Sequence, residues 1–272
     1  MTKNKLFKGI WNRIKTATKW LLKGLLSKLL GCDKKKNGTN SSNSNTAQAT
    51  SLSDYVNSNS KKGFLTGIDI HETNNEINWK EVEKAGISFV YIKATEGIYF
   101  PQNHPVFINQ WTNVAKTTIL RGAYFYYVTD RLEDTPEKQA KNFIDSVLTV
   151  HKPTDLPPAL DIEKIDFSNV HRDQLEDNLL IWLGLVEKAF GKQPIIYTNR
   201  YYYKKILASG KLKDYPVWIA DPDSKEQPGA SNWVFWQNKL DAVVPFINDK
   251  VDLNRFKGNL SELKQLVNHN VP

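Results

Sequence analysis

The chain contains 272 residues, of which 40% are hydrophobic and 24% are charged. This length fits one large domain or two small ones, with enough apolar material for a hydrophobic core. The single cysteine, Cys32, excludes an intramolecular disulfide framework and a zinc site built from several thiolates. The histidines show no paired zinc-hydrolase spacing, and no run of about 18 apolar residues predicts a membrane-spanning helix. We therefore expect no metal and no organic cofactor.

The net charge of +8 is concentrated at the N-terminus. Residues 1–36 contain 11 of the 37 Lys and Arg and a single acid, Asp33, which leaves 26 basic against 28 acidic residues in the rest of the chain. Binding of nucleic acid requires basic residues collected on the folded surface. We therefore expect no nucleic-acid partner.

Residues 4–31 combine an apolar stripe with interleaved lysines. The apolar side chains recur at a spacing of three and four, which predicts an amphipathic helix: Phe7, Ile10, Trp11, Ile14, Ala17, Leu21, Leu25 and Leu29. This composition favours a helix that binds an anionic membrane surface or a carrier protein. However, Leu29-Leu30-Gly31-Cys32 resembles the lipobox of bacterial lipoproteins, in which the cysteine is acylated. Residues 1–32 are thus interpreted as a membrane- or partner-binding helix or as a lipid anchor at Cys32.

Residues 33–62 are rich in Ser, Asn and Thr and poor in large apolar side chains, so we expect a flexible linker. From Gly63 onward, short apolar runs alternate with helical patterns. This alternation predicts an α/β domain over residues 63–272 with a mostly parallel sheet or barrel. The expected strands lie at 66–70, 88–94, 120–128, 158–163, 194–198, 216–220 and 234–237. Helices are expected over 136–149 and along the apolar face from Leu175 to Phe190.

Acidic residues lie at or near the ends of three apolar runs, which are GIDI (67–70), LDIE (160–163) and VDLN (251–254). In α/β barrels the carboxyl ends of the strands meet at one mouth, so these acids should converge there. Asp161 and Glu163 are two residues apart and would point to the same face of a strand. Their repulsion raises one pKa and places a proton donor beside an anion, which glycoside hydrolysis requires. A single such acid more often caps a helix, but three segments together favour a site.

Aromatic and amide side chains lie near the same strand ends, and sugar rings stack on aromatic rings through their C–H faces. The aromatic candidates are Tyr124, Phe125, Tyr126, Tyr127, Tyr197, Trp218, Trp233 and Trp236. The alternating residues Phe125 and Tyr127 are expected in the core. Gln237, Asn199 and Asn254 are amides that can bind hydroxyl and acetamido groups.

Eight segments in order resemble glycoside hydrolase family 25, the lysozymes or N-acetylmuramidases. They are GIDIHETNNEINW (67–79), FVYIKATEG (89–97), GAYFYY (122–127), PALDIE (158–163), PIIYTN (194–199), VWIA (217–220), WVFWQ (233–237) and VDLN (251–254). The resemblance covers about residues 64–260. It implies a modified, partly irregular β/α, TIM-like barrel. It also implies hydrolysis of the β-1,4 bond between N-acetylmuramic acid and N-acetylglucosamine in peptidoglycan, in the cell envelope or outside the cell.

By motif, Glu163 matches the catalytic acid/base of the family. Asp161 matches the partner carboxylate that orients or polarises the 2-acetamido group of the substrate, and Asp69 and Asp252 match two further acids of the site. Four residues match positions around the sugar, namely Tyr124, Tyr197, Trp218 and Gln237. Tyr126 is a further substrate-binding candidate because it lies near the same strand ends.

The sequence departs from the family pattern at two places. His71-Glu72-Thr73-Asn74-Asn75 stands where Ser-x-x-Gln-Gly is frequent, and Phe125 replaces a histidine. One alternative is therefore a peptidoglycan-binding module with weak or no catalysis. Others are a wall-degrading toxin or cargo delivered through the N-terminal tail, and a membrane-active protein whose effector is that tail. Retention of all four acids favours the enzyme.

Overall fold

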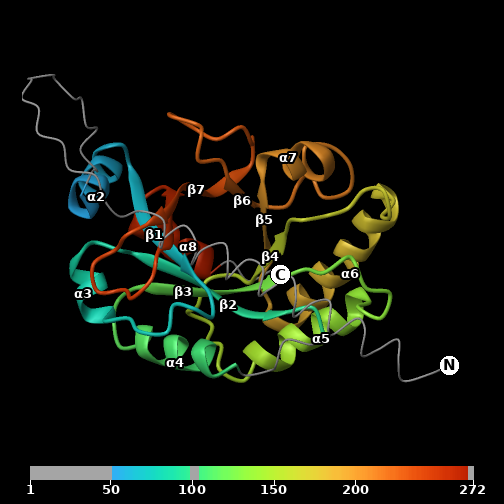
Figure 1. Cartoon of the computed structure of the whole chain (residues 1–272), viewed down its shortest axis with the longest axis horizontal. Helices are drawn as coiled ribbons and strands as arrows, with labels where there is room; N and C mark the ends of the chain where they lie inside the picture. The colour runs from blue at the N-terminus through green and yellow to red at the C-terminus, as the bar shows by residue number, and fades with distance from the viewer. Residues whose placement is uncertain (1–50, 99–103, 269–272) are drawn as a thin grey trace, which may run out of the picture. The chain divides into compact units, whose positions relative to one another are not determined.

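The computed structural model describes residues 51–98 and 104–268. Eight strands close into a barrel in chain order (Figure 1). They are β1 (Phe64–Ile70), β2 (Phe89–Glu96), β3 (Leu120–Tyr126), β4 (Ala159–Ile162), β5 (Ile195–Asn199), β6 (Val217–Ala220), β7 (Trp233–Ala242) and β8 (Val251–Lys257). Neighbours from β1 to β7 are parallel, whereas β8 is antiparallel to both β7 and β1. The prediction of a TIM-like α/β barrel is confirmed.

Helices cover the outside of the barrel (Figure 1). They are α2 (Leu52–Lys61), α3 (Trp79–Lys84), α4 (Pro105–Val114), α5 (Pro136–Val147), α6 (Arg172–Phe190), α7 (Arg200–Tyr202) with a π-helical turn at Tyr203–Leu207, and α8 (Leu260–Asn268). The apolar face expected from Leu175 to Phe190 is buried along α6. Phe125 and Tyr127 point outward from the barrel into the layer beneath these helices, and the expectation that they belong to the core is confirmed.

Aromatic side chains fill the barrel interior below the mouth. Phe89 and Tyr91 point inward from β2, two residues apart, as the two-residue period of a strand requires. Gly67 and Gly122 make room for these rings, since a Cβ atom at either glycine would lie 2.3 Å from the facing ring. Because this layer closes the interior, the inward-facing residues one step further along each strand form the floor of a site at the mouth.

Helix α2 lies within the segment expected to be a flexible linker. The Asn59 amide donates to Thr66 Oγ1 at 2.9 Å, and its Oδ1 accepts from Arg255 Nε at 2.7 Å. The buried Tyr55 hydroxyl donates to Asn238. The linker prediction is therefore wrong for residues 52–61. This helix is held to the barrel by specific polar contacts that its low hydrophobicity does not reveal.

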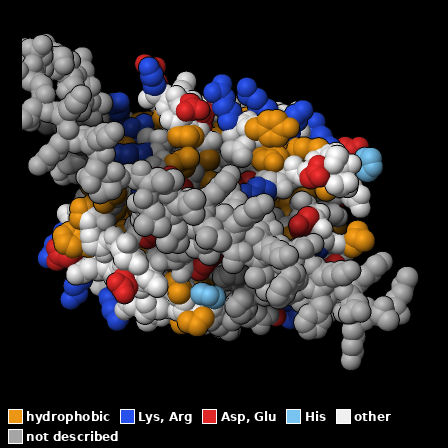
Figure 2. Space-filling model, viewed as in Figure 1, with side chains coloured by type: hydrophobic (Ala, Val, Ile, Leu, Met, Phe, Trp, Pro, Cys, Tyr) orange, Lys and Arg blue, Asp and Glu red, His pale blue; other side chains and the backbone are white. Residues whose placement is uncertain are grey.

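The expectations for the helix over residues 1–32, including Cys32, and for the linker up to residue 50 lie outside the described residues. No helix in the ranges 51–98 and 104–268 is long and apolar enough to cross a membrane. On the face shown in Figure 2, basic and acidic side chains both occur on the described surface, with small groups of hydrophobic side chains between them.

Candidate active site

A cavity of 140 Å³ opens at the mouth of the barrel, where the parallel strands end. It is lined by Asp69, His71, Tyr124, Asp161, Glu163, Tyr197, Trp218, Gln237 and Asp252. The structure thus brings together all four acids singled out in the sequence and four of the five expected substrate-binding residues. Tyr126 is not part of this lining.

Asp69 and Asp252 lie on neighbouring strands at one side of the cavity. They are register partners in the antiparallel pair of β1 and β8. The sequence placed Asp252 at or near the end of an apolar run, but it is the second residue of β8 and reaches the mouth because that strand runs in the opposite direction. Burial and the nearby Asp252 charge raise the pKa of Asp69 to about 7, although Asn254 and Gln237 donate to Asp69 Oδ2 at 2.7 and 2.9 Å.

Asp161 and Glu163 lie on the opposite arc of the barrel, at the end of β4. Asp161 is 6% exposed, and its Oδ1 has no hydrogen-bond partner among the residues that the structure describes. Burial, followed by the charges of Glu163 and Asp69, raises the pKa of Asp161 well above its ordinary range. Burial also raises the pKa of Glu163, and Lys164 opposes this shift. Burial thus disfavours the ionised form of both carboxyls.

Aromatic rings and amides form the wall between the two pairs of acids. The Tyr197 and Trp218 rings meet edge to face at a centroid distance of 4.7 Å. Tyr197 donates its hydroxyl hydrogen to Gln237 Oε1 at 3.0 Å, and Trp218 Nε1 donates to Asn254 Oδ1 at 2.7 Å. Asn254, which the sequence offers as a sugar-binding amide, is fully buried. Its amide accepts from Trp218 and donates to Asp69, and it thereby orients the acid.

Two lysines flank Tyr126, which is the register partner of Asp161. The ammonium groups of Lys93 and Lys164 lie 5.5 and 5.6 Å from the centre of its ring. Lys164 has a left-handed backbone with φ of 57°, a conformation that is costly for a residue with a side chain. Lys93 also pairs with Glu96 at 2.8 Å, so these two residues order the strand end.

His71 is the site residue that the sequence reasoning missed. In the sequence it stands out only as a departure from the family pattern, although it lies two residues after Asp69 and so continues the inward-facing series. Its Nδ1 atom lies 3.4 Å from Thr73 Oγ1 and 4.0 Å from Glu72 Oε2. Within the described ranges, no group of three or more His, Cys, Asp or Glu side chains is arranged to hold a metal ion.

Comparison with known proteins identifies the family. The family model for glycosyl hydrolases family 25 matches residues 68–245, which include three of the four acids and end before Asp252. The chain belongs to this family. A relative, the uncharacterized protein YegX of Escherichia coli (strain K12), is 32% identical over 213 residues, which cover 75% of this chain and 73% of YegX.

Other relatives are lysozymes and a glycosyl hydrolase of the same family. Lysozyme M1 of Streptomyces globisporus is 28% identical over 215 residues, covering 75% of this chain and 72% of that protein. A family 25 glycosyl hydrolase from Bacillus anthracis superposes with a TM-score of 0.66 at 28% identity, covering 77% and 95% of the two chains. A lysozyme from Streptomyces coelicolor gives a TM-score of 0.65 at 26% identity, covering 76% and 98%. The prediction of a lysozyme-type glycoside hydrolase that acts on peptidoglycan is confirmed.

Proposed function

We propose that this lysozyme cleaves the β-1,4 bond between N-acetylmuramic acid and N-acetylglucosamine, with Glu163 as general acid/base and Asp161 as its partner. The observation that carries the assignment is the buried Asp161 Oδ1, which has no hydrogen-bond partner in the described part of the chain and lines the same cavity as Glu163. An unpaired buried acceptor is costly, so a substrate donor that reaches it gains affinity. The N–H of a 2-acetamido group is such a donor.

The chemistry then divides between the two carboxyls. Glu163 donates its proton to the glycosidic oxygen, and the C1–O bond breaks while positive charge develops at the sugar ring. The acetamido carbonyl oxygen bonds to C1 as Asp161 accepts the N–H hydrogen bond, which gives an oxazolinium ion. Glu163, now a carboxylate, takes a proton from water. The water oxygen bonds to C1 as the bond between C1 and the acetamido oxygen breaks, which restores the acetamido group. Two inversions at C1 retain the anomeric configuration.

The remaining acids set the electrostatic field of the site, and the aromatic rings bind the substrate. Asp69 and Asp252 contribute negative charge that stabilises the cationic intermediate. Tyr124, Tyr197 and Trp218 offer ring surface to the apolar faces of the sugars, and their contacts with one another keep that surface rigid. Gln237 uses its amide within the wall, donating to Asp69 and accepting from Tyr197, so its role is orientation of the acid.

Digestion of purified peptidoglycan tests this proposal. Mass spectrometry of the products should find N-acetylmuramic acid at the new reducing ends, and NMR at early times should find the β-anomer. Products with N-acetylglucosamine at the reducing end would contradict the bond assignment, and the α-anomer would contradict the oxazolinium route. Binding of sacculi with no release of reducing ends would support the alternative of a wall-binding module.

The N-terminal segment supports a separate proposal about attachment. Residues 1–32 combine an apolar stripe with most of the net positive charge, which favours an anionic membrane surface or a carrier protein as partner. The enzyme itself acts on the cell wall, in the envelope or outside the cell. Acylation of Cys32 is the alternative. In that case Cys32→Ser would release the protein, whereas electrostatic attachment would be lost at high salt and would survive this substitution.

A further inference from the structure

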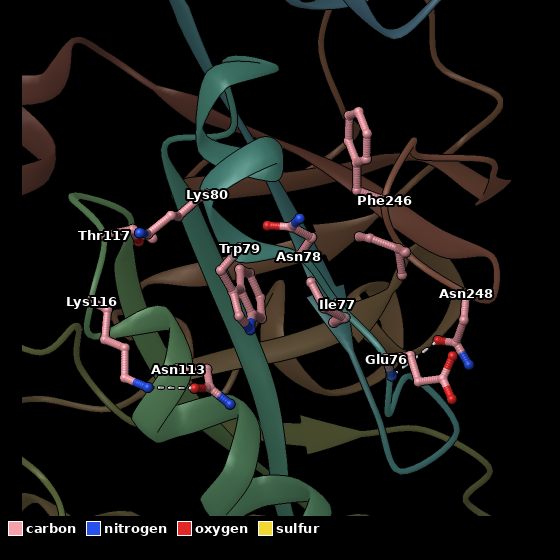
Figure 3. Close-up of a pocket in the computed structure, with 11 residues that line it drawn as sticks. Glu76, Ile77, Asn78, Trp79, Lys80, Asn113, Lys116, Thr117, Phe246 and Asn248 are labelled. Carbon is pink, nitrogen blue, oxygen red and sulfur yellow. Dashed lines mark hydrogen bonds between the residues drawn. The ribbon is translucent and has the colours of Figure 1, made fainter.

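A wide groove lies on the flank of the barrel, outside the catalytic cavity. It has a volume of 710 Å³ and is formed by the start of α3, the end of α4 and the connection between β7 and β8. Figure 3 shows Asn78, Trp79 and Lys80 between Lys116 on one side and Phe246 on the other. The catalytic reaction described above uses none of these residues.

Two loops connect the groove with the catalytic cavity. The loop after β1 gives His71 to the cavity and Glu76–Asn78 to the groove, and the β7–β8 connection leads from Phe246 to Asp252. Hydrogen bonds join the loops along their length: Thr73 Oγ1 to Asp249 at 3.0 Å, Asn248 N to Glu76 O at 3.1 Å and Asn78 N to Phe246 O at 3.0 Å. These hydrogen bonds make a continuous edge between the cavity and the groove.

Phe246 presents an exposed ring at the cost of backbone strain. Its φ is 73°, in the left-handed region that bulky residues avoid, and 53% of its surface is accessible. Packing in the hydrophobic core does not explain why a phenylalanine occupies this strained position, because an exposed ring contributes little to the core. Strain of this kind concentrates at sites that contact ligands.

The charges of the groove match the substrate. Lys80 and Lys116 are exposed on its lining and Glu76 is the acid, so the lining carries a net positive charge. Peptidoglycan strands carry stem-peptide carboxylates beside sugar rings whose apolar faces stack on aromatic side chains. The Phe246 ring can stack on a sugar, and the two lysines can bind the carboxylates.

We infer that this groove is a second, non-catalytic binding site for a peptidoglycan strand, which holds the strand at a distance from the bond that is cleaved. The inference rests on the proposed function, because the same polymer must occupy the catalytic cavity. It predicts that the groove contributes to binding of long or insoluble substrate and does not contribute to cleavage of a short one.

Phe246→Asn in the full chain tests the site, because asparagine tolerates the left-handed backbone and the variant loses only the ring. Binding to sacculi stripped of phosphate polymers is measured by co-sedimentation in a Glu163→Gln background. We expect a loss of about three- to tenfold, the size of one aromatic contact. Phe246→Tyr should bind as the parent does, and Lys116→Gln should weaken binding at low salt only.

The control is Val243→Asn, which removes an apolar side chain that is 78% exposed on the same connection but outside the groove. It should leave binding unchanged. In the catalytically intact chain, Phe246→Asn should leave kcat/KM on a soluble tetrasaccharide unchanged. Unaltered sacculus binding by Phe246→Asn, or an equal loss with Val243→Asn, would overturn the inference. Failure of the intact enzyme to cleave the tetrasaccharide would instead contradict the proposed function.

Discussion

Asp69 and Asp252 stand directly opposite each other across the one seam where the first and last strands of the barrel pair. Like charges at facing positions of an antiparallel pair destabilise the sheet. The protein retains both. Asn254 and Gln237 donate hydrogen bonds to the Asp69 carboxylate, and Asp241 N donates to the Asp252 carboxylate. The seam therefore exchanges stability for a concentrated negative charge at the mouth. Burial is the main cause of the raised pKa of both carboxyls, and the charge of Asp252 adds to the shift at Asp69.

This arrangement predicts how stability depends on pH. The pKa of Asp69 rises from an ordinary 3.8 to about 7 in the folded protein, so its neutral form stabilises the fold below about pH 4 and that contribution is lost as pH rises through 7. Asp69→Asn should thus reduce the fall in Tm between pH 4 and pH 7.5. The control is the exposed Asp166, whose pKa is lowered by Ser168, so Asp166→Asn should lower Tm slightly at neutral pH and have no effect at acid pH. An unchanged pH profile for Asp69→Asn would contradict the assignment.

Glu163→Gln should abolish turnover while preserving the fold. The amide has nearly the same shape but cannot deliver a proton to the leaving oxygen, so kcat should fall by about 10²- to 10⁴-fold. Tm should be unchanged or higher, since burial already disfavours the ionised form of Glu163. Release of reducing ends within a few-fold of the parent rate, at equal Tm, would contradict the assignment of Glu163 as the general acid/base.

Asp161→Asn should also reduce kcat severely, for a different reason. Its amide can present either a carbonyl oxygen or an N–H group where Asp161 Oδ1 is unpaired, but it carries no charge to stabilise the oxazolinium ion. We expect a loss in kcat of about 10²-fold or more with a small change in KM. A mild effect on kcat would move the stabilising role to Asp69 or Asp252, and Asp252→Asn measured in parallel separates these cases.

Removal of α2 should destabilise the barrel although this helix is remote from the cavity. A chain starting at Ala49 should unfold in urea as the full chain does, whereas one starting at Gly63 leaves Arg255 and Thr66 without the Asn59 side chain. Each buried group left unpaired costs about 1–3 kcal/mol. Asn59→Ala should reproduce part of the loss and the exposed Ser60→Ala should not. Equal urea midpoints for the two truncated chains would contradict this account of α2.

Short-range regularities in the sequence were sufficient for an α/β domain with a mostly parallel sheet or barrel and for acids that converge at the strand ends. The choice of a barrel came from the resemblance to the family. Parallel strands alternate with helices, and the two-residue period of a strand places Asp161 and Glu163 on one face. The rest depends on contacts between distant segments. The direction of β8, the docking of α2 through Asn59 and the burial of Asn254 beneath Trp218 are set by pairing partners that local composition does not identify.

The pairing of β1 with β8 also determines when this enzyme becomes active. Asn254 and Asp69 are 185 positions apart, so formation of the hydrogen bond that orients the acid requires closure of a loop that spans most of the domain. A nascent chain without β8 has neither a closed barrel nor Asp252, whatever part of the remaining sheet has formed. Wall-degrading activity is thereby coupled to completion of the domain, and folding intermediates of this lysozyme should be catalytically silent.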